Sequence, residues 1–309
     1  MTGSGRPIRV RAFAKLNLEL RVGSVQADGY HPLRTVFQSI ALHDVLEVTL
    51  RRGPFALTCD DPAVPIDGRN LVSKAASALW ALMGRGGEPR GAAVHLTKQV
   101  PMQAGLGGGS ADAAAALVAL SRAWRVRVAP SALAGMARGL GADVPYFLVG
   151  GTALGLGRGD EIYPLEDIEP HHVVLALPGF GVSTAGAYRW FDADRLESAH
   201  RARPGAETVL PAWKGTGLAV VNDLEAPVAR RHPEIASMRG TLMKAGARAA
   251  AMTGSGSAVF GLFVREGAAR AAARTVAEAG HAAILTRTVD RRACHRIHFS
   301  FASSSPRRA

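Results

Sequence analysis

The chain has 309 residues, of which 48% are hydrophobic and 20% charged, and its formal net charge is +12. A chain of this length is expected to form about two domains, each with its own hydrophobic core. It contains no run of 18 apolar residues, which argues against a transmembrane helix. Residues 1–11 lack the apolar core of a signal peptide, and Cys59 and Cys294 form neither a disulfide framework nor a zinc spacing. We therefore expect a cytoplasmic protein without a membrane partner.

The positive charge is compatible with a nucleic-acid surface or with an acidic small-molecule substrate. The basic residues are scattered, and the aromatic content of 6% leaves few side chains on which bases could stack. Their densest cluster lies in residues 287–308, which we interpret as a solvated C-terminal extension. A small-molecule substrate is favoured and no nucleic acid is expected, with nucleic-acid binding as the alternative from another functional class.

Residues 9–22 alternate between apolar and more polar side chains, which predicts a half-buried β-strand. The alternation puts Lys15 and Asn17 on the same, more polar face. From this pattern alone Lys15 could equally be an ordinary surface charge. The Asp-Gly-Tyr-His-Pro sequence at 28–32 predicts a turn with Tyr30 and His31 in a loop. Further strands are expected at 46–50, 55–58 and 92–97, and a helix at 70–83.

The most informative stretch is Pro-Met-Gln-Ala-Gly-Leu-Gly-Gly-Gly-Ser-Ala-Asp at residues 101–112, which leads into an alanine-rich run. Glycines allow close approach of the backbone to a ligand, and alanines favour a helix, so the stretch predicts a glycine loop feeding a helix N-terminus. The free N–H groups there suit a phosphate, with Ser110 as the helix cap and Asp112 placed favourably for the helix dipole. A flexible loop is the alternative. No lysine follows Gly109, as a P-loop requires, and Ser110 stands where a dinucleotide fingerprint needs glycine.

A helix is expected at residues 130–139, followed by Gly-Ala-Asp-Val-Pro-Tyr-Phe at 141–147. Asp143 has apolar neighbours there. It is either the cap of the next helix, which the pattern favours, or a carboxylate in a partly dry site. Residues 150–159 predict a glycine-rich strand and turn, and the acidic, proline-flanked residues 161–171 predict an interdomain linker.

The second half of the chain predicts strands at 173–177, 249–252, 258–264 and 282–289, with helices beginning near 183, 222, 233 and 267. Residues 199–217 are polar and loosely patterned, which predicts a mobile connection. The glycine turn at 253–257 is by itself more typical of a hairpin than of a site. Strands and helices alternate in both halves without a strict β-α-β repeat, so the sequence predicts an α+β fold.

Three stretches, in this order, resemble the motifs of the GHMP small-molecule kinases: Ala-Phe-Ala-Lys-Leu-Asn-Leu at 12–18, the glycine loop at 101–111, and residues 252–260. Signs typical of members that act on a cytidine-bearing alcohol are Ala-Asp-Gly-Tyr-His, Gly-Ala-Asp-Val-Pro-Tyr-Phe and Asn-Asp-Leu-Glu at 27–31, 141–147 and 222–225. The resemblance implies an N-terminal domain like ribosomal protein S5 domain 2 in residues 1–165. It also implies a ferredoxin-like C-terminal domain in residues 166–309, with ATP and substrate in the cleft between the domains.

The reaction that this resemblance implies is phosphorylation by ATP of the 2-hydroxyl of a cytidine diphosphate-linked methylerythritol. Asp143 would act as the base, with Lys15 beside it. An alcohol is a poor nucleophile at neutral pH, so a carboxylate within hydrogen-bond reach should take its proton. Lys15 can keep that carboxylate ionised and favour the negative charge that develops on the transferred group.

The resemblance also implies which residues bind the two substrates. The ATP phosphates are expected on the glycine loop, at Pro101, Gly105, Leu106, Gly107, Gly108, Gly109, Ser110 and Ala111. Tyr30 and Tyr188 would stack on the two faces of the cytosine. The rest of the substrate would be bound by His31, Asn17 and Thr184, and the site would be closed near the phosphates by Gly254, Ser255 and Gly256.

Magnesium is expected to accompany ATP, but the metal ligands stay unassigned. Relatives such as mevalonate kinase use a loop serine at a place where this chain has glycine. The alternative enzymatic interpretation is another GHMP kinase, of the homoserine or mevalonate type, which would not recognise cytosine. A monomer and a homodimer are both compatible with the sequence.

Overall fold

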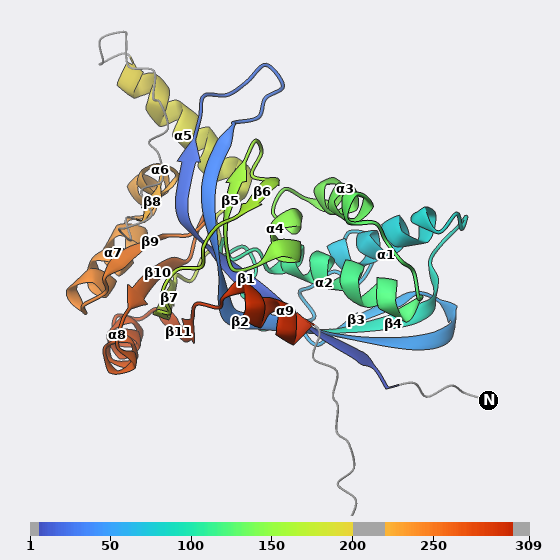
Figure 1. The fold of residues 1–309 in the computed structure, drawn as a ribbon. Coiled ribbons are helices and arrows are strands. Elements are labelled where there is room, and N and C mark those ends of the chain that lie inside the picture. The colour runs from blue at the N-terminus through green and yellow to red at the C-terminus, as the bar shows by residue number, and fades with distance from the viewer. Residues whose placement is uncertain (1–5, 200–219, 299–309) are drawn as a thin grey trace, which may run out of the picture.

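The computed structural model describes residues 6–199 and 220–298. Two long antiparallel strands, β1 (Ile8–Val22) and β2 (Leu33–Pro54), run through its centre. One group of helices lies on one side of these strands, and a second sheet with its own helices lies on the other (Figure 1). The first sheet has the order β3-β4-β2-β1-β8, and β5 and β6 extend from β2. Its remaining strands are β3 (Ala56–Cys59), β4 (Arg90–Thr97), β5 (Thr152–Leu156), β6 (Glu161–Pro164) and β8 (Val221–Asn222).

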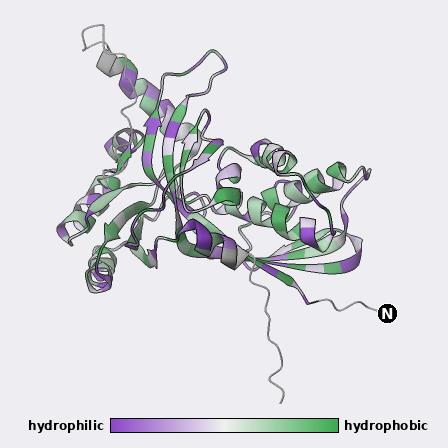
Figure 2. Ribbon diagram, in the orientation of Figure 1, coloured by the Kyte–Doolittle hydropathy of each residue, from purple (hydrophilic) through white to green (hydrophobic). Residues whose placement is uncertain are grey.

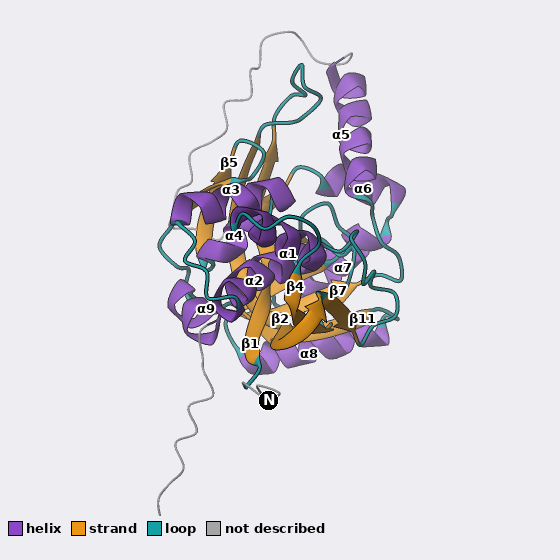
Figure 3. Cartoon of the chain, turned by 90° about the vertical axis from the view of Figure 1, so that its right-hand side faces the viewer, coloured by secondary structure: helices purple, strands orange, loops and turns teal. Residues whose placement is uncertain are grey.

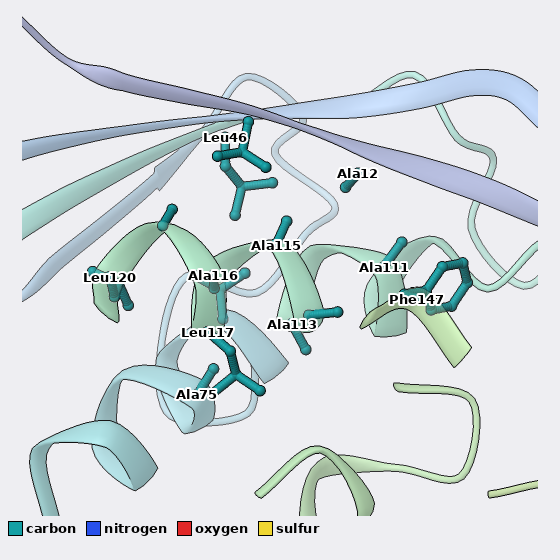
Figure 4. Packing of buried hydrophobic residues seen from close by; sticks show 14 of the residues in the cluster. Ala12, Leu46, Ala75, Ala111, Ala113, Ala115, Ala116, Leu117, Leu120 and Phe147 are labelled. Atoms are coloured by element: carbon teal, nitrogen blue, oxygen red, sulfur yellow. The ribbon is translucent and has the colours of Figure 1, made fainter. Parts of the chain in front are cut away.

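The helices of the first half surround one central helix, α2. They are α1 (Leu71–Leu82), α2 (Gly108–Ala123), α3 (Pro130–Leu140) and α4 (Val144–Val149), which lie in front of the strands in Figure 3. The alanines of α2 give it high helix propensity, and their small side chains let it lie close to its neighbours. Ala115 faces Leu46 of the sheet, and Leu117 faces Ala75 of α1 (Figure 4). The helices predicted at 70–83 and 130–139, and the helix after the glycine loop, are confirmed.

Strand β1 is buried on both faces over most of its length, so the prediction of a half-buried strand is wrong in this respect. One face contacts three hydrophobic cores in turn, with Ala12 against the first helices, Leu16 against the second sheet and Leu20 in the core of the second half. The opposite face carries Lys15 and Asn17, each only 3% exposed. These polar side chains can be buried because they bond to each other. The register with β2 shifts on both sides of this pair, an irregularity that is frequent next to active sites.

The second sheet is antiparallel and has the order β11-β7-β10-β9. Along β10 the side chains alternate. Phe260 and Leu262 pack toward the first sheet, and Val259 and Phe263 pack toward the helices. The predicted α+β fold in two parts is confirmed. The strands are β7 (His172–Leu177), β9 (Ala249–Met252), β10 (Val259–Phe263) and β11 (Ala282–Arg287), and the helices are α5 (Thr184–Ala199), α6 (Glu225–Arg231), α7 (Glu234–Lys244) and α8 (Glu266–Glu278).

The connection between the two sheets is shorter than the linker predicted at 161–171. Residues Glu161–Pro164 form β6, which pairs with β5, so the change of sheet falls between Pro164 and His172. The segment expected to open a helix at Asn222 first adds a short parallel strand, β8, to β1. Both corrections arise because strand pairing outweighs local composition, in β6 with the preceding strand β5 and in β8 with the distant strand β1. The connection predicted at 199–217 lies almost wholly outside the described residues.

Part of the C-terminal extension predicted at 287–308 lies within the described residues. Residues Arg291–His298 form α9, which is strongly hydrophilic (Figure 2) and returns to lie across β1. Its Cys294 is 1% exposed. The composition of the segment concealed this packing, because Cys294 is a small residue within a basic stretch and adds little to a hydrophobic pattern. Across residues 6–199 and 220–298, no helix is both long and apolar enough to cross a membrane.

Candidate active site

A cavity of about 550 Å³ opens where β1, the glycine loop, the start of α4, the start of α5 and the 253–257 turn converge. It has both polar and apolar walls, as substrate sites commonly do. Most of the predicted site residues line it: Lys15, Asn17, Pro101, Gly105, Leu106, Gly107, Gly108, Gly109, Ser110, Asp143, Thr184, Tyr188, Gly254, Ser255 and Gly256. The walls do not include Tyr30, His31 or Ala111, and Ala111 is a buried residue of α2 that packs in the first hydrophobic core.

The glycine loop ends at Gly107, which has φ of +74° and occupies the N-cap position of α2. A Cβ atom at Gly107 would lie 2.6 Å from Cζ of Phe147, so both the backbone angle and the packing require glycine. The first N–H groups of a helix have no partner within the helix, and Gly108 and Gly109, which carry two of these groups, line the cavity. The predicted anion site therefore has the geometry of a helix N-terminus that opens into a cavity.

Two details predicted for this loop are wrong. Ser110 lies inside α2 and is not its cap, because glycine already adopts the left-handed conformation at position 107. Asp112 lies beyond the first turn of α2, so the placement predicted for it at the positive end of the helix dipole is wrong. It is 3% exposed and forms an ion pair with Lys98. The hydroxyl of Ser110 is thereby available to the cavity, which its residue lines.

Lys15 and Asp143 meet across the cavity wall, with Lys15 Nζ 3.4 Å from Asp143 Oδ2. Lys15 Nζ also donates a hydrogen bond of 2.6 Å to Asn17 Oδ1, and Asn17 Nδ2 donates one of 2.7 Å to Thr35 Oγ1. The Lys15 side chain is 4% exposed, whereas that of Asp143 is 35% exposed. A fixed ammonium thus stands beside a carboxylate that a substrate hydroxyl could reach.

Asp143 occupies the N-cap position of α4, but its side chain makes no capping hydrogen bond. The interpretation of this aspartate as a cap, which the sequence pattern favoured, is therefore wrong for the side chain. The alternative of a carboxylate in a partly dry site agrees with the structure. The difference arises because Lys15, more than 100 residues earlier in the sequence, provides the partner.

The 253–257 turn is both a hairpin connection and a wall of the cavity. It joins the antiparallel strands β9 and β10, and Gly254 and Ser255 face the cavity. Asn222 Nδ2 donates 2.8 Å hydrogen bonds to the carbonyls of Met252 and Gly254. The Thr184 and Ser255 hydroxyls lie 3.1 Å apart. The sequence analysis noted Asn222 as part of a helix start and of a family motif, and its role in holding the turn depends on contacts that local pattern does not reveal.

A buried charge cluster that the sequence did not predict lies beneath the glycine loop. Lys98, a residue of the cavity wall, bonds to Asp44 and, at 2.9 Å, to Asp112 Oδ2. Asp44 Oδ1 also accepts the N–H groups of Gln99 and Val100. Burial, reinforced by the nearby Asp44 carboxylate, raises the pKa of Asp112 to about 8 despite the opposing effect of Lys98. The one signal in the sequence was a lysine placed between an apolar strand and Pro101.

The predicted aromatic residues lie in different surroundings. Tyr188 faces the cavity, and burial raises the pKa of its hydroxyl to about 12, with the nearby Asp143 carboxylate acting in the same direction. His31 lies behind it, with ring centroids 5.2 Å apart, and His31 Nε2 is 3.3 Å from Asp192 Oδ2. Tyr30 is 53% exposed, and the Arg158 guanidinium lies 3.7 Å from its ring centroid. The structure thus brings Tyr188 to the cavity and leaves Tyr30 outside it.

No metal centre built from side chains is apparent in the described part of the chain, which has no group of three or more histidine, cysteine, aspartate or glutamate residues suited to a metal ion. Among the described residues that line the cavity, only Asp143 carries a carboxylate. Mg²⁺ commonly binds through one or two carboxylates together with substrate phosphates. The cavity therefore fits a magnesium ion that a nucleotide would bring with it.

Comparison with known proteins agrees with this arrangement. Residues 70–151 match the model of the GHMP kinases N terminal domain, and residues 212–282 match that of the GHMP kinases C terminal domain. The chain is 41% identical over 283 residues to 4-diphosphocytidyl-2-C-methyl-D-erythritol kinase of Moorella thermoacetica, with 90% of this chain and 98% of that protein covered. It is 43% identical to the enzyme of that name from Solibacter usitatus, with 84% and 82% covered.

Comparison with solved structures also places the chain among kinases of this family. A crystal structure of 4-(cytidine 5'-diphospho)-2C-methyl-D-erythritol kinase is similar with a TM-score of 0.72 and 36% identity, covering 91% of this chain and 98% of the other. Homoserine kinase from Cytophaga hutchinsonii has a TM-score of 0.67 at 17% identity, covering 94% and 96%, a likeness that concerns the fold alone. The protein thus belongs to the GHMP kinase family, and within that family it groups with the 4-diphosphocytidyl-2-C-methyl-D-erythritol kinases.

Proposed function

We propose that the protein transfers the γ-phosphoryl group of ATP to the 2-hydroxyl of 4-diphosphocytidyl-2-C-methyl-D-erythritol, which gives the 2-phosphate and ADP. The observation that carries this proposal is that Lys15, Asp143 and the N-terminus of α2 all face one cavity. A base, a fixed positive charge and a phosphate site are the parts that phosphoryl transfer to an alcohol requires. The substrate is proposed from the relatives that are 41–43% identical.

In the proposed mechanism the Asp143 carboxylate accepts the proton of the substrate hydroxyl. The substrate hydroxyl oxygen forms a bond to the γ-phosphorus of ATP. At the same time the bond between the γ-phosphorus and the β,γ-bridging oxygen breaks, and its electron pair stays on the bridging oxygen, which leaves as part of ADP. Lys15 favours the negative charge that spreads over the transferred group, because its ammonium is fixed by Asn17 and needs no reorganisation. Tyr188 cannot serve as the base near neutral pH, since its pKa is about 12.

The nucleotide phosphates are proposed to bind at Gly105, Gly107, Gly108 and Gly109, with Ser110 at the same helix end. Magnesium would neutralise phosphate charge, and the Asp143 carboxylate and the Ser110 hydroxyl belong to the cavity-lining groups that could approach it. The turn at Gly254, Ser255 and Gly256 would close this part of the site. These assignments are consistent with a net charge of +12 and a polyanionic substrate pair.

The cytidine end of the substrate is proposed to lie against Tyr188, with Thr184 and Asn17 supplying polar contacts. Tyr30 and His31 stay predictions for this role, because they lie outside the cavity walls. His31 could act through the Tyr188 ring that it contacts. Cytoplasmic location and the choice between monomer and homodimer also stay predictions.

The test is ADP release by the purified protein with ATP, magnesium and one of three alcohols, namely the diphosphocytidyl substrate, homoserine or mevalonate. We expect turnover only with the first. Asp143→Asn should retain nucleotide affinity and lose at least ~100-fold in kcat, as expected when a general base is removed. Turnover with homoserine or mevalonate would retain the family and reject the substrate, and full activity of Asp143→Asn would reject the base.

A further inference from the structure

The proposed base stands at one end of a helix whose other end is held by the C-terminal helix. Asp143 directly precedes α4, which spans only Val144–Val149. A helix of this length is about 9 Å long, so a displacement at its C-terminal end is carried to its N-terminal end. Apart from its ion pair with Lys15, the Asp143 side chain makes no capping hydrogen bond that would fix it independently. The position of the carboxylate therefore depends on what holds α4.

Helix α9 contacts the chain where α4 ends. His295 Nε2 lies 2.9 Å from the carbonyl oxygen of Val149. A Cβ atom at Gly150 would be 3.0 Å from Cβ of Cys294, and one at Gly151 would be 2.7 Å from the backbone nitrogen of Arg291. The two glycines thus allow α9 to lie directly on the turn that follows α4.

Charged groups fix α9 in this place. Asp167 Oδ1 accepts the N–H group of Thr152, and Asp167 Oδ2 accepts the N–H group of Arg291. Arg291 Nη2 donates hydrogen bonds of 2.6 Å and 2.9 Å to the carbonyls of Thr152 and Leu165. Hydrogen bonds to charged groups are stronger than those between neutral groups, so this connection is firm.

Tyr146 connects the same turn with the wall of the cavity. Its hydroxyl donates to the Gly151 carbonyl at 2.8 Å and lies 2.7 Å from Ser39 Oγ. Its ring stacks on Phe37 with the centroids 4.6 Å apart, and Phe37 lines the cavity beneath Lys15, whose Nζ is 5.7 Å from the ring centroid. One continuous set of contacts therefore runs from α9 through the turn and Tyr146 to both members of the Lys15–Asp143 pair.

We propose that α9 is a positioning element for catalysis, in which Arg291 acts through the 150–152 turn and Tyr146 to hold Asp143 at its distance from Lys15. The inference rests on the proposed function, because it assigns Asp143 as the base. Arg291 and Tyr146 are positioning residues, since neither lines the cavity. A misplacement of about 1 Å caused by a distant substitution can lower a rate ~100-fold, which makes such an element measurable.

The test compares Arg291→Met with Arg292→Met in the full chain. Arg292 is the neighbouring residue on α9 and is exposed, so its variant controls for the loss of one positive charge from the same helix. We expect Arg291→Met to lower kcat ~10–100-fold with the KM for ATP changed less than ~3-fold, and Arg292→Met to behave as the wild type. Arg291→Lys should restore part of kcat, because lysine can still donate to the two carbonyls.

Each protein is assayed at least 15 °C below its own melting temperature, so that unfolding does not contribute to the result. A purely structural role predicts a lower melting temperature with unchanged kcat, and that result would overturn the inference. Should Arg291→Met fail to fold, Tyr146→Phe removes only the hydroxyl, and a kcat within ~2-fold of the wild type would then overturn the inference. Absence of wild-type turnover with the diphosphocytidyl substrate would instead reject the proposed function.

Discussion

Substitution of Gly105 by alanine is expected to disrupt the contact between the glycine loop and the 253–257 turn. Gly105 has φ of +75°, and a Cβ atom there would lie 2.1 Å from the carbonyl oxygen of Thr253 and 3.2 Å from that of Gly256. Alanine in this backbone conformation costs about 1–2 kcal/mol. Overpacking adds about 1–3 kcal/mol, and backbone atoms cannot yield as a flexible side chain would. The free energy of unfolding should therefore fall by about 2–5 kcal/mol.

Gly109→Ala is the matched control. Gly109 lies four positions further along the same loop and helix, and a Cβ atom there would meet nothing within 4 Å. It lies inside α2, where alanine is favoured over glycine by about 0.5–1 kcal/mol. Equilibrium urea unfolding without nucleotide, followed by circular dichroism, separates this effect from any change in ligand binding. If Gly105→Ala unfolded at the same urea concentration as the wild type, the close approach of the two turns would be refuted.

Three further predictions concern the charged and aromatic residues of the site. Burial raises the pKa of Asp112 from its ordinary value of 3.8 to about 8 in the folded state. Between these values the folded protein binds more protons than the unfolded chain, so this residue's contribution to stability is lost progressively as pH rises toward about 8. Asp112→Asn should therefore flatten the decline of the unfolding free energy between about pH 5 and pH 8, a decline of up to about 1.4 kcal/mol per pH unit, and parallel curves for the two proteins would contradict the burial argument. Lys15→Met should lower kcat ~100–1,000-fold in steady-state assays, with unchanged kcat arguing against its role in charge stabilisation. Tyr188→Ala should weaken binding of the cytidine substrate, measured by calorimetry, by about 1–3 kcal/mol. An equal loss of binding free energy in Tyr30→Ala would mean that the loop around Tyr30 closes over the cavity.

The parts of the site that were predicted correctly are those encoded in short stretches of sequence. The alternation around Lys15 placed it correctly on one face of β1 with Asn17, because side chains two apart in a strand share a face. The glycines of the 101–112 loop indicated a helix N-terminus, because only glycine adopts the left-handed angles found at Gly107 without strain. The residues that the structure brings to the cavity otherwise came from the family resemblance, which joins segments that local patterns cannot connect.

The features that the sequence did not predict are those that depend on partners far along the chain. From the sequence Lys98 cannot be distinguished from an ordinary surface lysine, because its partners Asp44 and Asp112 lie elsewhere in the chain. Helix α9 has the composition of a basic extension, because its contacts include those of the polar Arg291 and His295 and of the small, buried Cys294, while Arg292 is exposed. Burial of both faces of β1 likewise requires knowledge of what covers each face. In each case the missing information is tertiary and not local.

Strand β1 explains why the two halves of the molecule cannot be separated without loss of the site. One of its faces contributes Ala12, Leu16 and Leu20 to three different hydrophobic cores, the last of which belongs mainly to the second half of the chain. Its other face presents Lys15 to Asp143, while the backbone N–H of Asn17 donates to Thr253 Oγ1 in the 253–257 turn. The same strand therefore packs against both halves and orients the charged pair between them. Since the strand cannot shift in one core without disturbing the others, the packing of the whole molecule fixes the geometry on which phosphoryl transfer would depend.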